Sequence, residues 1–328
     1  MRCISRAKSA ALVCVASISL FTGGCIGGKG ATPVTAYELK NYNQDLYQGK
    51  LYAEELCVAQ NDVALEGYTE DTELHSAALF DLTGERVLYS YKAHERLYPA
   101  STTKIMTALL AIENANLDDQ VTISGNADAS SLPADAQVCG LAKGEVWTLR
   151  DLLGALLLYS GNDAATAIAE YVGGSEEAFV NMMNRRAQEL MANGTHFMNP
   201  HGLHDDNHYT TAYDLYLIFN ECIKHEDFVN IIQSEAYTAY YTDVDGNSQE
   251  ALFTPTNLYA QGEVDVPENV TIIGGKTGTT DEAGYCLILM EKDSSDNPYI
   301  SIVMGASEKP VLYEDMTSLI EAIPSGQQ

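Results

Sequence analysis

Positive charge is scarce in this sequence. Its 328 residues include 18 lysines and arginines against 46 aspartates and glutamates, which gives a formal net charge of −28 at pH 7. Nucleic-acid binding depends on a basic surface, and docking on an anionic membrane depends on a basic patch. The composition therefore argues against both functions and predicts a domain with an acidic, solvated surface.

Long apolar runs are also missing at the N-terminus. The apolar stretch at residues 9–21 is too short for a comfortable membrane span. Because three basic residues precede it, the stretch is typical of a secretory signal peptide. We expect residues 1–24 to be removed as a signal peptide of the lipoprotein type.

This segment ends in TGGC at residues 22–25, which resembles the cleavage site of bacterial lipoproteins. In that pattern the cysteine, here Cys25, is lipidated. An aliphatic residue is expected where Thr22 stands, so plain cleavage and an uncleaved anchor remain alternatives. The chain continues only briefly beyond its last predicted helix, so we expect attachment through the N-terminus. The prediction is an extracytoplasmic lipoprotein held at the membrane, or a secreted protein if Cys25 is not lipidated.

Closely spaced cysteines, as found in zinc sites, are absent as well. Beyond Cys25 the sequence contains Cys57, Cys139, Cys222 and Cys286. An exported protein can form disulfides, and four cysteines allow three complete pairings. If a bridge forms we expect Cys57–Cys139, with free buried thiols as the alternative.

The rest of the chain divides into a short polar segment and one domain. Residues 25–50 are rich in Gly, Thr, Asn and Gln and predict a tether, and residues 51–325 predict the folded domain. Two apolar runs around DLTGE, at residues 75–91, predict a β-hairpin. Three late apolar runs predict further strands, at residues 270–280, 284–291 and 299–307.

Helical periodicity lies mainly between these strand regions. Helices are predicted at residues 97–115, 148–174, 174–193, 210–224 and 310–323. Thr148 is expected to cap one of them, and Thr211 to form a weak capping box with Asp214. Short turns between the late strands favour antiparallel pairing. The pattern indicates an α+β fold, with an antiparallel sheet flanked by helices and a helical subdomain.

The first predicted helix carries two polar residues on its apolar face. Ser101 and Lys104 share the face of Ile105, Leu109 and Ile112. A lysine directed at a core is costly unless it is paired or neutral. We therefore expect this face to border a cleft at its first turn.

Three short motifs occur in order along the chain. They are S-x-x-K at residues 101–104, S-x-N at 160–162 and K-T-G at 276–278. Each is weak alone, and a P-loop is excluded because no G-x-x-x-x-G precedes Lys276. They fall at a helix start, at a break between helical segments and at the end of a strand-like run. This ordered set is typical of penicillin-binding proteins and serine β-lactamases.

Longer segments around these motifs extend the resemblance. YPASTTKIMTALLA, SGNDAA, THFMNPHGLHDDNHYTTAYDL and GGKTGTTDEAGYCL are similar to segments of the serine-type D-alanyl-D-alanine carboxypeptidases, the low-molecular-weight penicillin-binding proteins. The resemblance covers roughly residues 50–325 and implies a β-lactamase/DD-peptidase-like fold. It implies removal of the terminal D-alanine from peptidoglycan stem pentapeptides, and covalent binding of β-lactam antibiotics.

The residue types fit such acyl transfer, which needs an activated hydroxyl. Ser101 at a helix N-terminus experiences partial positive charge that favours an alkoxide. Lys104 can act as a base if burial and a nearby Lys276 lower its pKa. The resemblance implies the same roles, with Ser101 as acylated nucleophile and Lys104 as general base. It also implies that Ser160 relays a proton to the leaving D-alanine.

The resemblance further implies a set of substrate-binding residues, namely Asn162, Lys276, Thr277, Gly278 and Thr279. Asn162 would hold the amine of Lys104 and the substrate amide. The lysine and threonine of the K-T-G motif would hold the terminal carboxylate. The oxyanion hole would be formed by the backbone N–H groups of Ser101 and Thr279.

Three other functions are alternatives to the carboxypeptidase interpretation. A β-lactamase needs a carboxylate that activates the deacylating water. Residues 189–193 approach its E-x-x-L-N pattern but depart at Ala192 and fall within a predicted helix. A D,D-endopeptidase that cleaves cross-links would use the same site, and a non-catalytic sensor would bind β-lactams or wall peptides without turnover.

No metal or cofactor is expected. HGLHDDNH at residues 201–208 contains three histidines, but its spacing is unlike H-E-x-x-H and its composition suits a loop. Tyr237, Tyr240 and Tyr241 could line a glycan-binding groove. Ordinary half-buried surface is the preferred interpretation of these tyrosines.

Overall fold

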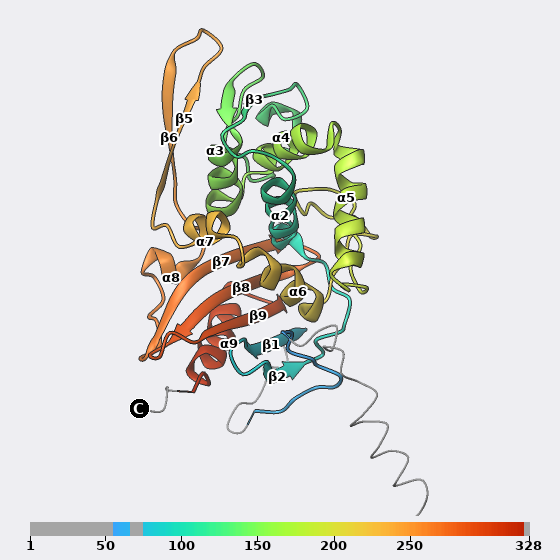
Figure 1. Ribbon diagram of the computed structural model, residues 1–328, viewed down its shortest axis with the longest axis vertical. Helices are drawn as coiled ribbons and strands as arrows, with labels where there is room; N and C mark the ends of the chain where they lie inside the picture. The colour runs from blue at the N-terminus through green and yellow to red at the C-terminus, as the bar shows by residue number, and fades with distance from the viewer. Residues whose placement is uncertain (1–54, 66–74, 325–328) are drawn as a thin grey trace, which may run out of the picture. The chain divides into compact units, whose positions relative to one another are not determined.

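The computed structural model describes residues 55–65 and 75–324, which all fall in the unit Ala53–Gln328. The predicted signal peptide, Cys25 and the whole predicted tether lie outside the described residues. Two sheets and the helices around them make an α+β fold (Figure 1), as the sequence predicts. Within the described residues, no helix combines the length and the apolar character needed to cross a membrane.

The larger sheet has five strands in the order β2-β1-β9-β8-β7, and every neighbouring pair is antiparallel. Its strands are β1 (Ser76–Asp81), β2 (Arg86–Tyr91), β7 (Val270–Thr280), β8 (Gly284–Asp293) and β9 (Pro298–Ala306). The hairpin predicted at residues 75–91 is confirmed as β1 and β2. The three late strands are confirmed as β7, β8 and β9.

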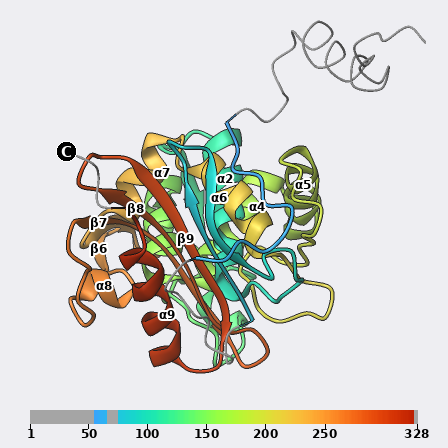
Figure 2. The same ribbon diagram turned by 90° about the horizontal axis from the view of Figure 1, so that it is seen from below.

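Both faces of this sheet are covered, which explains the nearly continuous apolar runs of β8 and β9. Helix α9 (Lys309–Glu321) packs on one face against β8 and β9. Helix α6 (Ala212–Cys222) packs on the other face against β1 and β9. Figure 2 shows α9 on one side of the sheet and α2 and α6 on the other.

One row of residues across the sheet fixes which face each side chain takes. Lys276 pairs with Ile288, Ile288 with Ile302, Ile302 with Ala78, and Ala78 with Ser90. Ala78, Ile288 and Ile302 belong to the core shared with the helices opposite α9. By the alternation of strand residues, Lys276 faces those helices, and Thr277 faces the α9 side.

The helical part contains most of the remaining elements. They are η1 (Ala100–Thr103), α2 (Lys104–Asn114), η2 (Ala129–Ser131), α3 (Leu149–Gly154), η3 (Ala155–Tyr159), α4 (Asn162–Gly173), α5 (Glu176–Glu189), α6, α7 (Glu226–Ile232) and α8 (Leu258–Gln261). Hydroxyls cap three of them, since the side chains of Thr148, Ser175 and Thr211 accept the N–H of Asp151, Ala178 and Asp214.

Several local details differ from the predictions. The first helix is split, with a 3₁₀ turn at Ala100–Thr103 before the α-helix. The Thr211 cap is present, but the carboxylate of Asp214 accepts from Thr195 Oγ1. A second, four-stranded sheet was not predicted; its order is β3 (Gln120–Thr122), β4 (Val146–Thr148), β5 (Tyr237–Thr242) and β6 (Ser248–Phe253). Strands of three residues carry too little periodicity to be recognised from sequence.

The four cysteines Cys57, Cys139, Cys222 and Cys286 are free thiols. The expected Cys57–Cys139 bridge is therefore wrong, and the alternative of free thiols holds. Cys57 donates to the carbonyl of Asp81 at the end of β1, whereas Cys139 lies against Gly161 in the S-x-N motif. Burial raises the pKa of all four thiols, to about 11 for Cys57 and Cys286, so they are poor nucleophiles.

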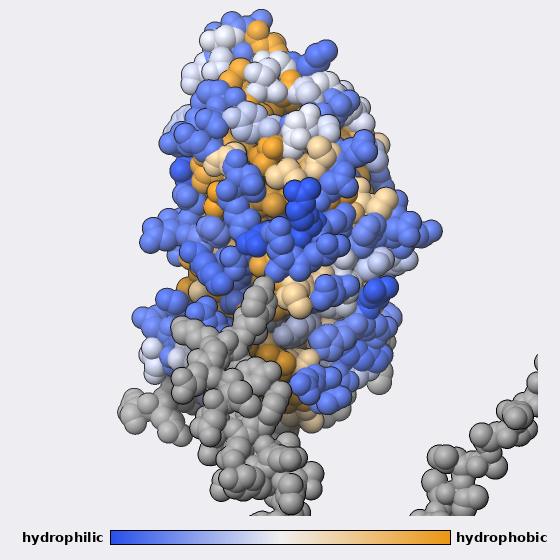
Figure 3. Space-filling model, turned by 45° about the vertical axis from the view of Figure 1, so that its right-hand side comes forward, coloured by the Kyte–Doolittle hydropathy of each residue, from blue (hydrophilic) through white to orange (hydrophobic). Residues whose placement is uncertain are grey.

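On the face shown in Figure 3, hydrophilic residues predominate and apolar residues occupy smaller areas between them. Described apolar residues that are strongly exposed include Tyr240, Val244 and Leu252, all in the β5–β6 hairpin. Such a surface agrees with the acidic composition.

Glu291 on β8 is a buried acid with a stability consequence. It is 0% exposed and shares the α9 face with Leu287 and Leu289, and burial raises its pKa well above the ordinary value. A carboxyl that prefers to be neutral when folded loses its stabilising contribution as pH rises through its folded pKa. Glu291→Gln should therefore unfold at a higher temperature than the wild type at pH 8, and the difference should shrink towards pH 4.

The gain in the free energy of unfolding should grow by about 1.4 kcal/mol for each pH unit between the unfolded and folded pKa values. Thermal unfolding at several pH values measures it. Glu314→Gln, an exposed position on α9, is the matched control and should show no such trend. Equal unfolding temperatures of wild type and Glu291→Gln across this range would contradict the prediction.

Candidate active site

Ser101 lies in η1, one residue after an unusual backbone conformation. Ala100 has φ +47°, in the left-handed region that non-glycine residues rarely adopt. Ser101 itself is partly exposed, and the side chain of Thr102 donates to the carbonyl of Pro99. The turn thus places the Ser101 hydroxyl at the start of α2, where a helix favours negative charge.

Lys104 is completely buried at the beginning of α2. Its Nζ lies 2.9 Å from Ser101 Oγ, 2.6 Å from Asn162 Oδ1 and 2.6 Å from the carbonyl oxygen of His201. Burial, and then the charge of Lys276, lower its pKa well below the ordinary value. The sequence predicted that burial and the charge of Lys276 would lower the pKa of Lys104, and the structure supports both causes.

The lowered pKa of Lys104 favours a neutral amine, which has two N–H groups and one lone pair for these three neighbours. The carbonyl of His201 and Oδ1 of Asn162 can only accept, so they take both N–H groups. The lone pair is then left for the hydroxyl of Ser101. When Lys104 is neutral, Ser101 can donate to this lone pair, and the 2.9 Å distance suits a nucleophile beside its base.

Ser160 follows the π-helical segment η3, and its φ of +71° turns the chain into α4. Its Oγ lies 2.9 Å from Nζ of Lys276, which also donates to the carbonyl of Thr277. Lys276 is 1% exposed, and burial lowers its pKa to about 7. Asn162 begins α4 and donates its backbone N–H to the carbonyl of Gln137.

The K-T-G motif lies on β7, an end strand of the five-stranded sheet. Gly278 faces η1: a Cβ there would stand 3.0 Å from the backbone nitrogens of Ser101 and Thr102. Thr279 is exposed and faces the cleft that contains Ser101. The absence of a side chain at Gly278 thus lets β7 approach the nucleophile turn closely.

These residues surround a cleft of about 610 Å³. Ser101, Asn162 and Thr279 line it, together with residues of three loops: 133–137, 202–204 and 280–282. Lys104 is buried and bonds to two of these lining residues, Ser101 and Asn162. Ser160 and Lys276 are also buried and bond to each other. The structure therefore gathers all three motifs at one place.

A family model of the D-alanyl-D-alanine carboxypeptidases (peptidase family S11) matches residues 64–308. The chain belongs to this carboxypeptidase family. The D-alanyl-D-alanine carboxypeptidase DacF of Bacillus subtilis is 34% identical over 254 residues, which cover 76% of this chain and 61% of DacF. The chain thus spans less than two thirds of the length of DacF.

Two further comparisons involve Streptomyces K15. Its D-alanyl-D-alanine carboxypeptidase is 32% identical over 244 residues, covering 71% of this chain and 81% of that protein. The crystal structure of the Streptomyces K15 DD-transpeptidase matches with a TM-score of 0.71 and 29% identity, over 78% of this chain and 98% of that one. The expected DD-peptidase-like fold is confirmed.

Within this carboxypeptidase fold, the loop HGLHDDNH acts as scaffold. The carbonyl of His201 binds Lys104, and Nε2 of His208 lies 2.8 Å from Thr103 Oγ1. Burial lowers the pKa of His201 to about 3 and that of His208 to about 4, so both are neutral near pH 7. The sequence did not predict the His201 contact, because a backbone carbonyl can come from any residue type.

Gly202 fits against the nucleophile turn. Its φ is +91°, and a Cβ there would stand 1.9 Å from the carbonyl oxygen of Ala100. Gly202→Ala should displace either Ala100 and Ser101 or the loop that carries the His201 carbonyl. We expect acylation of Ser101 to fall by at least about tenfold, which corresponds to about 1.4 kcal/mol and is within the cost of such backbone strain.

The measurement is the second-order rate of labelling by a fluorescent penicillin, with urea unfolding measured alongside. Gly140→Ala is the matched control, because it also has positive φ (+88°) but a Cβ there would meet nothing within 4 Å. If Gly202→Ala is acylated as fast as Gly140→Ala, the close contact has no consequence for the site.

Asp163 is a further residue that the sequence did not predict. It is 0% exposed, follows Asn162, and accepts backbone N–H groups from Cys139, Gly140, Leu141 and Ala164. It therefore fastens the loop at residues 139–141 to the S-x-N motif. The aspartate stands in the SGNDAA segment, but the pattern alone gave no indication of these contacts.

The residues that the sequence suggested for a β-lactamase or for a glycan groove are not among those that line the cleft. Glu189 ends α5, where it pairs with Arg186 at 3.5 Å, and it is not among the residues that line the cleft. Tyr237 donates to Asp151, and Tyr241 stacks on Trp147 with ring centroids 4.1 Å apart. Of the three tyrosines only Tyr240 is strongly exposed, which supports ordinary surface over a glycan groove.

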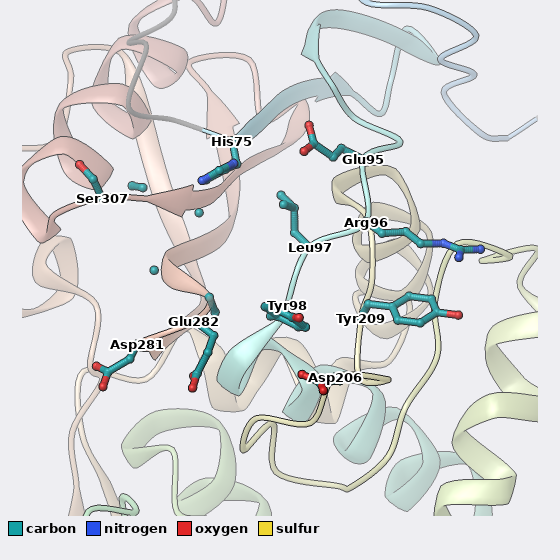
Figure 4. Close-up of a pocket in the computed structure, with 14 residues that line it drawn as sticks. His75, Glu95, Arg96, Leu97, Tyr98, Asp206, Tyr209, Asp281, Glu282 and Ser307 are labelled. Atoms are coloured by element: carbon teal, nitrogen blue, oxygen red, sulfur yellow. The ribbon is translucent and has the colours of Figure 1, made fainter.

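A second cavity, of about 570 Å³, adjoins the cleft and shares Asp281 and Glu282 with it. Figure 4 shows Glu95 and Asp206 on other parts of its wall, apart from these two. The four carboxylates do not converge on one point. Among the described residues, the only group whose spacing suits a metal is Glu113, Glu221 and His225, and Arg186 already pairs with both glutamates.

Proposed function

We propose that this protein is a serine-type D-alanyl-D-alanine carboxypeptidase that removes the terminal D-alanine from peptidoglycan stem pentapeptides. The observation that carries the proposal is the buried amine of Lys104 at 2.9 Å from Ser101 Oγ, where burial lowers its pKa and so favours the neutral form. DacF and the Streptomyces K15 relative are both named as D-alanyl-D-alanine carboxypeptidases, which supports it.

The proposed reaction begins when Lys104 accepts the hydroxyl proton of Ser101. Ser101 Oγ attacks the carbonyl carbon of the penultimate D-alanine, and the oxyanion is held by the N–H groups of Ser101 and Thr279. The C–N bond then breaks, and the proton taken up by Lys104 is relayed through Ser160, beside Lys276, to the leaving amine. Water hydrolyses the ester on Ser101 by the reverse proton path.

Substrate binding is assigned to the rest of the site. Lys276 and Thr277 would hold the terminal carboxylate, and Asn162 the substrate amide. A β-lactam would acylate Ser101 in the same way, because its strained amide is attacked while its leaving nitrogen stays attached to the ring. No metal or cofactor takes part in any of these steps.

The test is release of D-alanine from a peptide ending in D-Ala-D-Ala by the wild type and by Ser101→Ala. Release by the wild type and none by the variant supports the proposal. Release that survives Ser101→Ala overturns the mechanism. Cleavage of cross-linked peptide dimers faster than of pentapeptides would favour a D,D-endopeptidase, and β-lactam binding without any peptide cleavage would favour a sensor.

The pH dependence follows from Lys276. Its pKa of about 7 means that the free enzyme loses this cation as pH rises above 7. A terminal carboxylate binds the cation and raises its pKa in the complex. We therefore expect KM to rise about tenfold per pH unit above pH 7 while kcat changes little, as measured by D-alanine release between pH 6 and 9. A constant KM over this range would contradict the assignment of Lys276.

We also propose that residues 1–24 are a signal peptide, that Cys25 carries a lipid, and that the protein acts outside the cytoplasm at the membrane. The basic start, the apolar stretch and TGGC support this, and the proposed substrate lies outside the cytoplasm. Mass spectrometry of the N-terminus of the mature protein tests it. An unmodified Cys25, or a mature chain that begins elsewhere, would overturn the lipid anchor.

A further inference from the structure

The hydroxyl of Thr277 has a partner that no motif predicts. Its Oγ1 lies 2.6 Å from Oγ1 of Thr256. Thr256 belongs to the segment between β6 and α8, and it is partly buried. Figure 1 shows α8 at the side of the sheet where β7 lies. A segment outside all three motifs therefore contacts the K-T-G threonine.

This segment is firmly held. Asn257 is 4% exposed and caps α8 by accepting the N–H groups of Tyr259 and Ala260. The carbonyl of Pro255 accepts from the side chain of Gln261. Thr256 lies between these two anchored residues, so its hydroxyl has a fixed position relative to β7.

In the proposed function, the side chains of Lys276 and Thr277 both bind the terminal carboxylate. Their neighbouring positions on β7 direct them to opposite faces of the sheet. Lys276 faces the helices, whereas Thr277 is in the row of Leu287 and Val303, on the α9 face. The two side chains can therefore meet one carboxylate only around the outer edge of β7, the last strand in the sheet order. Threonine is restricted at χ1, so a different rotamer would exchange its hydroxyl for its methyl group.

Binding of the carboxylate by Thr277 requires one direction for this bond, since either hydroxyl could be the donor. A hydroxyl has one hydrogen to donate, and a carboxylate can only accept. If Thr277 donated to Thr256, it would have no hydrogen for the substrate. If Thr256 donates, Thr277 accepts that bond and directs its own hydrogen at the carboxylate.

We propose that Thr256 is a positioning residue for carboxylate recognition, which selects the rotamer of Thr277 and leaves its proton for the substrate. The inference rests on the proposed function, in which Thr277 binds the terminal carboxylate. Thr256 itself does not touch the reacting atoms.

The test compares two probes that differ only at the carboxylate: benzylpenicillin and its methyl ester. Thr256→Val keeps the shape of the side chain and removes the hydroxyl. We expect acylation by benzylpenicillin to slow about tenfold and acylation by the ester to stay unchanged, because a hydrogen bond to a charged group is worth about that factor. Thr256→Ser keeps the hydroxyl and should retain the wild-type preference. For peptide hydrolysis, KM should rise in Thr256→Val with kcat unchanged.

Several outcomes overturn the inference. An unchanged preference in Thr256→Val does so, and so does an equal loss with both probes, which would show a merely structural role. Thr254→Val, an exposed position in the same segment, is the matched control and should behave as the wild type. If Thr256→Val fails to fold by circular dichroism, Thr256→Ala takes its place in the same comparison.

These experiments distinguish a failure of the proposed function from a failure of the role proposed for Thr256. A wild type that is acylated by benzylpenicillin but releases no D-alanine overturns the carboxypeptidase proposal, and the two-probe comparison still decides the role of Thr256. A wild type that neither probe acylates overturns both.

Discussion

Lys104→Met should slow acylation of Ser101 by at least about a hundredfold, the contribution expected of a general base. Lys104 is 0% exposed, and its amine is the group positioned to take the proton of Ser101 at 2.9 Å. Methionine fills a similar volume without an amine. Lys104→Arg should be as inactive, because arginine stays charged at any working pH, and its burial should also lower stability.

The measurement is the second-order rate of benzylpenicillin acylation, followed by mass spectrometry of the intact protein. Lys143→Met, an exposed lysine, is the matched control and should acylate at the wild-type rate. Urea unfolding shows whether Lys104→Met is folded. A folded Lys104→Met variant with a wild-type acylation rate would exclude Lys104 as the base.

The burial of Lys104 also explains why sequence could predict this part of the site. A lysine at helical spacing with Ile105 and Leu109 conflicts with an apolar face, and that conflict is visible without coordinates. The structure resolves it with three oxygen neighbours around Nζ. The order of the three motifs then predicted which distant residues, Asn162 and Lys276, would lie nearby.

Residues that act through their backbone or through unremarkable side chains were beyond sequence reasoning. The carbonyl of His201 carries no signature, and the hydroxyl of Thr256 is one of many. The strands β3 and β4 are three residues long, so their pairing depends on tertiary contacts rather than on local pattern. The Cys57–Cys139 prediction failed because sequence shows which thiols exist and not which lie together.

Asp163→Ala should be the most destabilising single change at the site, with an expected loss of at least about 3 kcal/mol in the free energy of unfolding. Both carboxylate oxygens accept backbone N–H groups, Oδ1 from Cys139 and Ala164 and Oδ2 from Gly140 and Leu141. Alanine leaves these donors without their acceptor in a place that is 0% exposed. Urea unfolding, monitored by fluorescence of Trp147, measures the loss.

Asp163→Asn separates the number of acceptors from the size of the side chain. Each carboxylate oxygen of Asp163 accepts two backbone N–H groups. The amide of asparagine has one oxygen, so its NH2 group would face two N–H donors and leave them without an acceptor. Its loss of stability should therefore lie between those of wild type and Asp163→Ala. Asp135→Asn, exposed in a neighbouring loop, is the matched control and should be neutral. An Asp163→Asn variant as stable as the wild type would show that one oxygen is enough.

Asp163→Ala should also slow the acylation of Ser101. Asn162 donates its backbone N–H to Gln137, and its side chain holds the amine of Lys104. When the loop at 139–141 loses its bonds to Asp163, Gln137 and Asn162 lose their shared support, and the Lys104 amine loses a fixed acceptor. Acylation of Ser101 in folded Asp163→Ala should then fall more than in Asp163→Asn, in the same order as stability. Equal acylation rates in the two variants would show that Asp163 stabilises the loop without positioning the base.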